Sequence, residues 1–476
     1  MPDDASFSRE EFGAVFQRFL EWVPMAATRE GSIAARLREH FGRDASTLPV
    51  TSEEVAEYDR ANLQVALDAY LSRPELSVEL LGVSSGSPFD PSLSQLVAAA
   101  APSTMRFEVG PVGRTVVELD EGRSLACVTL GLYLVSEADR RLAVLVTRQR
   151  PPMQTLVVEV MAPEAELGST FVAELRRLMR ERNIYRRKVI SLAATAGLMG
   201  QRIDVTFHSR QRVARDRIVL ADGVLERVEH STIEFDRQTE ALLASGRHLR
   251  RGLLLHGPPG TGKTLTATYL ADALADRTVV VLTGPALSLI RASCMLARDL
   301  EPSMVVLEDI DLVAEERTQM GAAATSMLFQ LLNEIDGMQE DANVIFLMTT
   351  NRADLLEPAL AARPGRVDQA VEFPLPGATA RKRLIALFCE GLSVELPNAD
   401  HLVEQTEGAS PAFLRELVRK AALYAAADGE STLNHTHFTR GLEELDEGGR
   451  LTRSILGAGT DPPPPATGFP HPGNRT

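Results

Sequence analysis

The most constraining feature of the chain is a glycine-rich stretch from Gly257 to Thr264, which reads Gly-Pro-Pro-Gly-Thr-Gly-Lys-Thr. An apolar run, Gly252 to Leu255, precedes it, and a helix-compatible run, Leu265 to Leu274, follows it. This order predicts a strand, a phosphate-binding loop and a helix whose positive end faces the phosphates. Glycines let successive backbone N–H groups curl around the phosphate oxygens. The sequence therefore predicts a nucleotide-binding site.

Two side chains of this loop carry specific expectations. Lys263 is expected to reach the β- and γ-phosphates, and the Thr264 hydroxyl is expected to complete the coordination shell of Mg²⁺. The other residues predicted to bind the cofactor lie in the loop or begin the helix: Gly257, Pro258, Pro259, Gly260, Thr261, Gly262 and Leu265.

Composition limits the possible partners and the compartment. The net charge of −15 argues against broad binding to nucleic acid or to membrane surfaces, because phosphate contacts need clustered positive charge. Cys127, Cys294 and Cys389 lie far apart, which favours a reducing compartment and no zinc site. The first residues lack the pattern of a signal peptide, and no apolar run approaches ~18 residues. We therefore expect a cytoplasmic protein without a membrane partner.

The pattern along the 476 residues predicts five regions. Apolar residues at helical spacing in Phe7–Thr28 and Glu53–Leu71 predict a helical region, and Gly, Ser and Pro between Gly82 and Ser94 predict a linker. The predicted regions are a helical region at 1–95, an α+β domain at 96–217, a nucleotide-binding domain at 218–376, a helical subdomain at 377–450 and a disordered tail at 451–476.

Short β-branched runs and one helical run define the predicted elements of the α+β domain. The predicted strands are Arg114–Leu119, Leu125–Val135, Leu142–Thr147, Leu156–Met161, Val189–Ala193 and Ile203–Phe207, and the predicted helix is Phe171–Arg182. Arginines are dense between residues 176 and 217. They favour solvated faces paired with acidic residues, and an anionic partner is the alternative.

Polar residues follow two further predicted strands. Met304–Leu307 ends in Glu308 and Asp309, and Val344–Met348 ends in Thr349-Thr350-Asn351. Ligands bind at the carboxyl edge of an open parallel sheet, so we expect these groups beside the phosphate loop. There Glu308 can orient Mg²⁺, Asp309 can polarise a water for in-line attack, and Asn351 can hydrogen-bond that water or the γ-phosphate.

Arg363 and Arg366 lie three residues apart in the segment that follows this strand. Both could point to one side of a short turn. The alternative is a pair of surface arginines that bind Glu357 or Asp368.

The order of these motifs resembles the AAA family of ATPases, in the branch with the second region of homology. The resemblance covers roughly residues 218–447 and is carried by GPPGTGKT, TTNRADLLEPALAARPGRVD and TEGASPAFLRELVRKAA. It implies an α/β fold: a P-loop AAA ATPase module, built as a parallel αβα sandwich with a small helical lid. It also implies ATP and Mg²⁺ as cofactors and hydrolysis of ATP. The helical region and the α+β domain would precede this module, as in a stand-alone bacterial type with its own N-terminal domain.

The resemblance also implies roles for individual residues. Asn351 would be the first sensor, and Arg363 and Arg366 would be arginine fingers donated to a neighbouring subunit. Use of such fingers implies a ring, usually a homo-hexamer, with nucleotide sites at the subunit interfaces. The lid around Gly408–Ala412 would cover the adenine, and no sensor arginine is expected there because the chain reads Ser410-Pro411-Ala412.

Two departures from the family pattern bear on mechanism. The usual acid pair is Asp then Glu, whereas this chain has Glu308 then Asp309, an inversion similar to that of the mitochondrial AAA translocase of the Rieske protein. A displaced carboxylate predicts slow hydrolysis, since a shift of about 1 Å can cost ~10²-fold in rate. The segment Thr283–Arg291 lacks the aromatic residue of polypeptide-threading members. Its Leu289 and Ile290 either grip an apolar segment weakly or pack into the core.

Three functions remain open from the sequence. The first is an ATP-hydrolysing ring that remodels or assembles a macromolecular partner, expected to be a protein bound through the N-terminal region. The second is a nucleotide-gated switch or scaffold with slow or dispensable hydrolysis. The third is a small-molecule phosphotransferase, which Arg363-Pro364-Gly365-Arg366 and the helical lid make improbable. No His-Glu-x-x-His motif is present, which excludes a fused zinc protease of that type.

Overall fold

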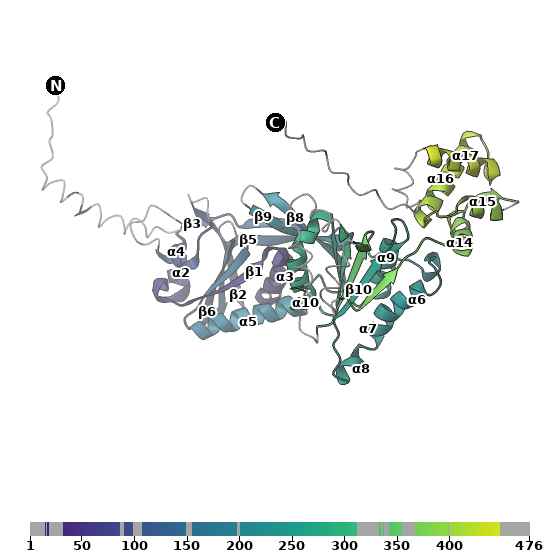
Figure 1. Cartoon of the computed structure of the whole chain (residues 1–476). Helices are drawn as coiled ribbons and strands as arrows, with labels where there is room; N and C mark the ends of the chain where they lie inside the picture. Colours follow the sequence, from purple (N-terminus) through teal and green to yellow (C-terminus); the bar gives the residue numbers. More distant parts are fainter. Residues whose placement is uncertain are drawn as a thin grey trace, which may run out of the picture. The chain divides into compact units, whose positions relative to one another are not determined.

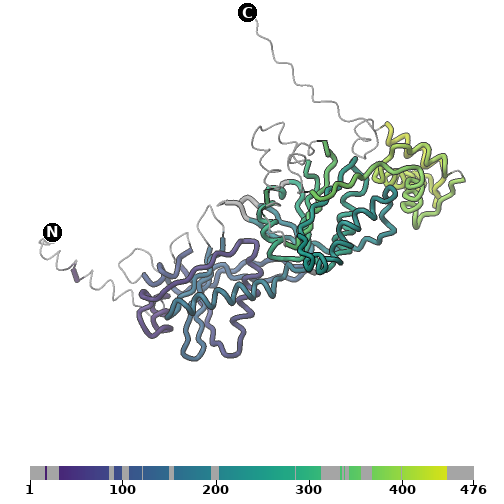
Figure 2. The backbone as a smooth tube through the Cα atoms, turned by 60° about the horizontal axis from the view of Figure 1, so that its bottom comes forward, coloured from purple at the N-terminus to yellow at the C-terminus, as the bar shows by residue number. Residues whose placement is uncertain are grey.

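The computed structural model describes residues 32–85, 90–98, 107–148, 155–197, 200–311, 342–354, 367–397 and 399–447, with isolated positions at 15, 17, 18, 333, 334 and 337. The chain divides into two compact units, Met1–Ser209 and Arg210–Thr476. The first is coloured purple to blue and the second teal to yellow (Figures 1 and 2). Across these described ranges, no helix is both long enough and apolar enough to cross a membrane.

The N-terminal unit is built on an antiparallel sheet whose strands follow the order β1-β7-β6-β5-β2-β3, with β4 also paired to β5. Strands β8 and β9 form a hairpin paired along its whole length. The elements are α2 (Ile33–Phe41), β1 (Val50–Ala56), α3 (Arg60–Leu71), β2 (Ser77–Ser85), α4 (Leu93–Ala98), β3 (Phe107–Gly110), β4 (Gly113–Glu118), β5 (Ser124–Glu137), β6 (Arg140–Arg148), β7 (Thr155–Met161), α5 (Ala165–Glu181), β8 (Val189–Gly197) and β9 (Gly200–His208).

Helices cover both faces of this sheet (Figure 1). Successive side chains of β6 accordingly pack into two different cores. Val144 and Val146 join a core with α3 and α5, whereas Ala143 and Leu145 join a second core with α2 and α4. All four side chains are fully buried. Successive residues of a strand point to opposite faces, so the middle of β6, from Leu142 to Val146, is apolar at every position.

The prediction of an all-helical region at residues 1–95 is wrong, because the region also contains two strands. Val50–Ala56 and Ser77–Ser85 are strands of the sheet, and α-helix in the predicted Glu53–Leu71 segment is confined to Arg60–Leu71. The predicted linker is also wrong at its start, because Gly82 to Ser85 completes β2. β1 buries only Val55, so its strand conformation depends on the ladder with β7, which local sequence does not encode. The predicted helix Phe7–Thr28 and the predicted tail 451–476 lie outside the described ranges, apart from isolated positions.

The predicted elements of the α+β domain are confirmed as β4 to β9 and α5. In the arginine-dense segment, Arg176 pairs with Glu53, Arg177 with Glu174, and Arg215 with Glu229. These pairs agree with solvated faces paired with acidic residues rather than with an anionic partner.

A parallel sheet forms the centre of the larger part of the C-terminal unit. Its strands follow the order β14-β10-β13-β12-β11, and every residue of β13 is buried. The elements are α6 (Val224–Glu229), α7 (Phe235–Arg237), α8 (Thr239–Ala244), β10 (Arg251–His256), α9 (Lys263–Ala273), β11 (Thr278–Thr283), α10 (Ile290–Asp299), β12 (Ser303–Glu308), β13 (Val344–Thr350) and β14 (Gln369–Glu372).

A small helical subdomain completes the C-terminal unit and has its own apolar core. Helix α16 begins at Pro411, because the Ser410 hydroxyl accepts a hydrogen bond from Phe413 N and Pro411 occupies the first turn. The elements are α14 (Ala378–Phe388), β15 (Ser393–Glu395), α15 (Ala399–Gln405), α16 (Pro411–Ala427), β16 (Thr432–Asn434) and α17 (His435–Glu447).

The segment that lacks an aromatic forms a 3₁₀ helix, Gly284–Leu289, followed by α10. The side chains of Leu287, Leu289 and Ile290 are all buried. The interpretation that these residues pack into the core is therefore confirmed for this conformation.

A buried arginine connects three elements of the parallel sheet domain. The Arg277 side chain is 1% exposed. Its Nε donates to Asp236 Oδ1 at 2.6 Å, and its Nη1 donates to the main-chain oxygens of Ser303 at 2.9 Å and Asn343 at 3.1 Å. These acceptors lie on α7, at the start of β12 and just before β13. The guanidinium thus supplies charged donors to oxygens of three separate segments.

Arg277→Met should lower the free energy of unfolding by about 1–3 kcal/mol, because it removes the hydrogen bonds of a buried guanidinium to Asp236 and to two main-chain oxygens. Arg237→Met is the matched control: Arg237 lies beside Asp236 on α7 and pairs with Glu234 at 3.3 Å on the surface. It should cost less than about 1 kcal/mol. Urea unfolding followed by circular dichroism measures both, and equal midpoints would contradict the role of Arg277.

Candidate nucleotide site

The loop between β10 and α9 is held in a shape that only glycine allows at two positions. Gly257 has φ +142°, and a Cβ there would lie 2.3 Å from the main-chain oxygen of Phe373. Gly262 has φ +102° and immediately precedes α9. A side chain would be strained at either position. The loop therefore passes close to the chain after β14 and turns its backbone into the start of α9.

Lys263 lies inside this loop. Its Nζ donates to the main-chain oxygens of Gly257 and Pro258, both at 2.8 Å. Burial lowers the pKa of Lys263 to about 8, and the nearby carboxylates of Asp309 and Asp311 oppose that shift. The ammonium is thus pre-positioned by loop carbonyls, from which anionic phosphate oxygens can take it over.

The two acids at the end of β12 face different neighbours. Burial raises the pKa of Glu308, and the neighbouring Thr264 hydroxyl opposes that shift. Asp309 instead faces Asn351, whose Nδ2 donates to Asp309 Oδ1 at 3.2 Å. Asp309 also has φ +51°, an uncommon conformation for a residue other than glycine. Such strain is concentrated at functional sites, where the surroundings hold it in place.

Hydrogen bonds between strand ends hold Asp309 and Asn351 in place. Asp309 N donates to Thr349 Oγ1 at 3.1 Å. Asp311 Oδ1 accepts from Thr350 Oγ1 at 2.9 Å and from Asn351 N at 3.2 Å. Asp311 is almost completely buried. The ends of β12 and β13 are therefore joined directly beside the phosphate loop.

A cavity of about 420 Å³ opens over this edge, within the size range of small-ligand sites. The lid closes part of it, since Ala412 N at the start of α16 donates to Gly260 O at 3.2 Å. Figure 1 shows α9 and the lid helices α14 and α16 in the same unit. The lining comprises Pro259, Gly260, Gly262, Lys263, Thr264 and Leu265 from the loop and α9, Asp309 and Asn351 from the strand ends, and Phe388, Pro411, Ala412 and Arg415 from the lid.

The structure brings together most of the residues that the sequence predicted for the site. Asp309, Asn351 and six loop residues line one cavity, and Glu308 adjoins it through Thr264. Gly257, Pro258 and Thr261 shape the loop, the last through a 2.8 Å bond from its hydroxyl to Pro258 O. Arg363 and Arg366 lie outside the described residues.

Three residues of the site were missed by the sequence interpretation: Asp311, Phe388 and Arg415. Asp311 was visible two residues after Asp309, but its role depends on the partner strand. Arg415 lies four residues after Pro411 on α16 and hence on the same helical face. That spacing was a usable signal for a basic group over the cavity. Within the described residues, Arg415 has no hydrogen-bond or ion-pair partner.

Comparison with known proteins identifies this part of the chain by class. Residues 253–375 match the ATPase family associated with various cellular activities (AAA), and residues 397–440 match the AAA+ lid domain. The C-terminal unit thus contains an AAA module of the P-loop ATPase class with its helical lid. The predicted α/β fold of this module is confirmed.

Among curated relatives, the chain is similar to a proteasome-activating nucleotidase of Sulfurisphaera tokodaii, 34% identical over 208 residues that cover 41% of this chain and 53% of the relative. It is 31% identical to the 26S proteasome regulatory subunit S10B homolog B of Arabidopsis thaliana over 228 residues, covering 45% and 57%. It is 32% identical to the ATP-dependent zinc metalloprotease FtsH 2 of Sphaerobacter thermophilus over 242 residues, covering 48% and 36%. The chain spans about half the length of the first curated relatives it matches.

The family model that matches residues 253–375 is that of an ATPase family, and the residues present fit ATP and Mg²⁺. The loop offers backbone N–H groups and a lysine for phosphate, and the Thr264 hydroxyl beside Glu308 offers oxygen ligands of the kind that Mg²⁺ prefers. The cavity under the lid is large enough for the remainder of a nucleotide.

Nucleotide binding should take up a proton around pH 8, because phosphate restores the charged form of a lysine whose pKa is lowered to about 8 in the free protein. ATP affinity should accordingly fall as the pH rises above this value. Calorimetric titration in buffers of different ionisation enthalpy measures the uptake. Lys263→Arg, whose guanidinium stays charged, should remove it. Proton uptake that is unchanged in this variant would contradict the assignment.

Arg415→Ala should weaken ATP binding roughly 10- to 100-fold, since a charged hydrogen bond contributes about 1.5–3 kcal/mol. Arg419→Ala is the matched control. Arg419 lies on the same helix but outside the cavity lining, and its Nη2 donates to Glu416 Oε1 at 2.6 Å. Titration with a fluorescent ATP analogue compares the two variants. Equal affinities would show that Arg415 does not contact the nucleotide.

Proposed function

We propose that the protein is an ATP-hydrolysing homo-hexameric ring that remodels or assembles a protein partner through its N-terminal unit. The observation that carries this proposal is the joined end of β12 and β13, where Asp309 and Asn351 line the same cavity as Lys263. This arrangement places a carboxylate and an amide where a water can be oriented toward a terminal phosphate.

Each residue has a distinct part in the proposed reaction. Lys263 and the loop N–H groups bind the phosphates, and Thr264 with Glu308 holds Mg²⁺, which when bound neutralises charge on the phosphate oxygens. Asp309 orients and polarises the attacking water. Asn351 positions that water or the γ-phosphate. By the family resemblance, Arg363 and Arg366 act on the nucleotide of the neighbouring subunit, where an arginine finger contributes ~10³–10⁵ in rate.

A protein partner is supported by the relatives' names and by the division of the chain. The names describe a nucleotidase that activates proteasomes, a proteasome regulatory subunit and an ATP-dependent protease. Both family matches begin after residue 209, so the N-terminal unit lies outside them. A separate unit with its own two cores suits the recognition of a partner.

Mixing two inactive variants tests the shared active site. Arg366→Ala and Asp309→Asn should each abolish Mg²⁺-dependent ATPase activity, because each removes one part of every site. An equimolar mixture should regain activity, since an intact Asp309 of one subunit can meet an intact Arg366 of another. Phosphate release and sedimentation of each sample measure activity and assembly. A native protein that hydrolyses ATP at full rate as a monomer would contradict the ring.

A nucleotide-gated switch is the second candidate, favoured by the order Glu308-Asp309 and by the hydrogen bond that engages Asp309 with Asn351. A shorter carboxylate in the water-orienting position predicts slow hydrolysis. Under this alternative, Asp309→Asn still assembles with ATP and still releases its partner. Under the ring motor, Asp309→Asn binds ATP and the partner but does not release it.

A further inference from the structure

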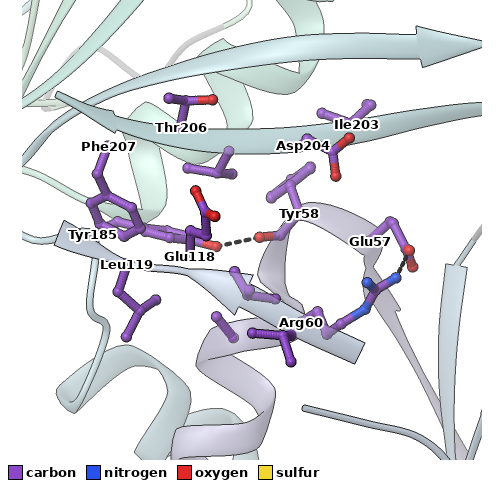
Figure 3. A pocket seen from close by; sticks show the side chains of 14 residues that line it. Glu57, Tyr58, Arg60, Glu118, Leu119, Tyr185, Ile203, Asp204, Thr206 and Phe207 are labelled. Carbon is purple, nitrogen blue, oxygen red and sulfur yellow. Dashed lines mark hydrogen bonds and ion pairs between the residues drawn. The ribbon is translucent and has the colours of Figure 1, made fainter. Parts of the chain in front are cut away.

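The N-terminal unit contains a second cavity, of about 370 Å³, that neither family match covers. It lies between β4, β9 and the turn that leads into α3, with Tyr185 at its wall. Figure 3 shows Glu57, Tyr58 and Arg60 facing the strand that carries Ile203, Asp204, Thr206 and Phe207. All of its lining residues belong to this one unit.

The cavity is bounded by strand edges rather than by sheet faces. Its lining includes four successive residues, 116–119, and five successive residues, 203–207. Successive side chains of a strand alternate between faces, so a cavity in contact with all of them lies along the edge. Within the described part of this unit, β4 pairs only with β5, and β9 pairs only with β8. An open edge offers main-chain N–H and C=O groups to an extended peptide.

The charge of the lining is negative. Glu57, Glu118 and Asp204 supply three carboxylates, against the single guanidinium of Arg60. Arg60 is committed to a buried ion pair with Glu57. Among the described residues, the Glu118 side chain has no ion-pair or hydrogen-bond partner. The cavity therefore favours a cationic group.

One buried oxygen points to a missing donor. The Glu57 side chain is only 9% exposed, and its Oε2 has no hydrogen-bond partner among the described atoms. A buried carboxylate oxygen without a donor is costly, whereas a charged donor stabilises it. A lysine or arginine side chain that enters the cavity would supply that donor.

The wall of the cavity suits the stem of such a side chain. Tyr185 is 1% exposed, and its hydroxyl donates to the main-chain oxygen of Tyr58, so that its ring is fixed. Its ring lies 5.7 Å from that of Phe207. Burial raises the pKa of Tyr185, which keeps the phenol neutral. Phe207 is only partly buried, so its ring, supported by Tyr185, supplies the aromatic surface that can accommodate methylene groups and attract a cation.

We propose that this cavity binds an extended polypeptide segment along the edges of β4 and β9, with a Lys or Arg side chain directed at Glu57 and Glu118. Val116 is 65% exposed on β4 and offers an apolar contact to the residue beside that cation. The assignment rests on the proposed function for its biological context, since it names the chemistry of the partner that the ring would engage. Binding itself requires no nucleotide.

Fluorescence anisotropy with the full-length protein tests the assignment. The probe is a labelled seven-residue peptide of alternating Thr and Val with one central Lys, and the comparison peptide has Glu at that position. The Lys peptide should bind with or without ATP, and the Glu peptide should bind at least about tenfold more weakly because it places like charges together. Equal binding of both peptides, or no binding of either, would overturn the assignment.

Variants of the lining separate this site from other surfaces. Glu118→Gln should weaken binding of the Lys peptide roughly three- to tenfold. Glu57→Gln should weaken it more strongly, since the Glu57 carboxylate is buried. Glu54→Gln is the matched control, an exposed residue of β1 outside the lining, and should leave binding unchanged. If Glu57→Gln does not fold, Glu118→Gln decides alone. Unchanged binding in Glu118→Gln would overturn the assignment, as would spermidine binding here without any peptide binding.

The ATPase readout distinguishes failure of this site from failure of the proposed function. Glu118→Gln should retain basal ATP hydrolysis and lose any stimulation by the Lys peptide. Charge-dependent peptide binding to a protein without a ring or ATPase activity would support the cavity and contradict the motor. An active ring that does not bind the peptide would support the motor and contradict the cavity.

Discussion

The contact between the ends of β12 and β13 is the constraint on which the nucleotide site depends. Parallel strands place their carboxyl ends at one edge, but that alone does not fix the side chains there. The bonds from Asp309 N to Thr349 and from Thr350 and Asn351 to Asp311 fix the relative positions of the two strand ends. Because Asp311 is buried, removing its carboxylate would leave these donors without an acceptor. The acid and the amide of the site are therefore positioned by the fold before any ligand binds.

The ligand-free site buries a lysine and a glutamate whose charged forms are disfavoured there, and a bound nucleotide with its metal ion would reduce that cost. Burial disfavours the charged form of Lys263 and of Glu308, as the shifts of both pKa values indicate. Loop carbonyls partly compensate the lysine, and the Thr264 hydroxyl partly compensates the glutamate. A nucleotide phosphate with its metal ion supplies the countercharge that each lacks. Binding is thus favoured by charges that the fold has already removed from water.

Sequence predicted what local patterns determine and missed what tertiary pairing determines. The three strands that end at the site are apolar at nearly every position, and the loop has a distinctive composition, so both were predicted at the correct residues. β1 was missed because its sequence buries only Val55 and gains its conformation from β7. Arg415 was missed because its role depends on where the lid lies over the loop, which the Ala412 to Gly260 bond sets. Arg363 and Arg366 remain predictions of the sequence.

The pairing of Asp309 with Asn351 links the proposed chemistry to the proposed response. An amide nitrogen carries two N–H donors, so Asn351 can keep one on Asp309 while the other faces a terminal phosphate. When that phosphate leaves, the second N–H donor of Asn351 loses its acceptor. The hydrogen bond between Asn351 and Asp309 then changes in strength or geometry. Asp311 accepts a hydrogen bond from the Asn351 main chain and so fixes it. The Asn351 side chain is therefore the part that can move when the phosphate leaves. Under the proposed function, the rate of hydrolysis and the signal of its completion would therefore depend on the same hydrogen bond between Asn351 and Asp309, and the shorter acid at this position would alter both together.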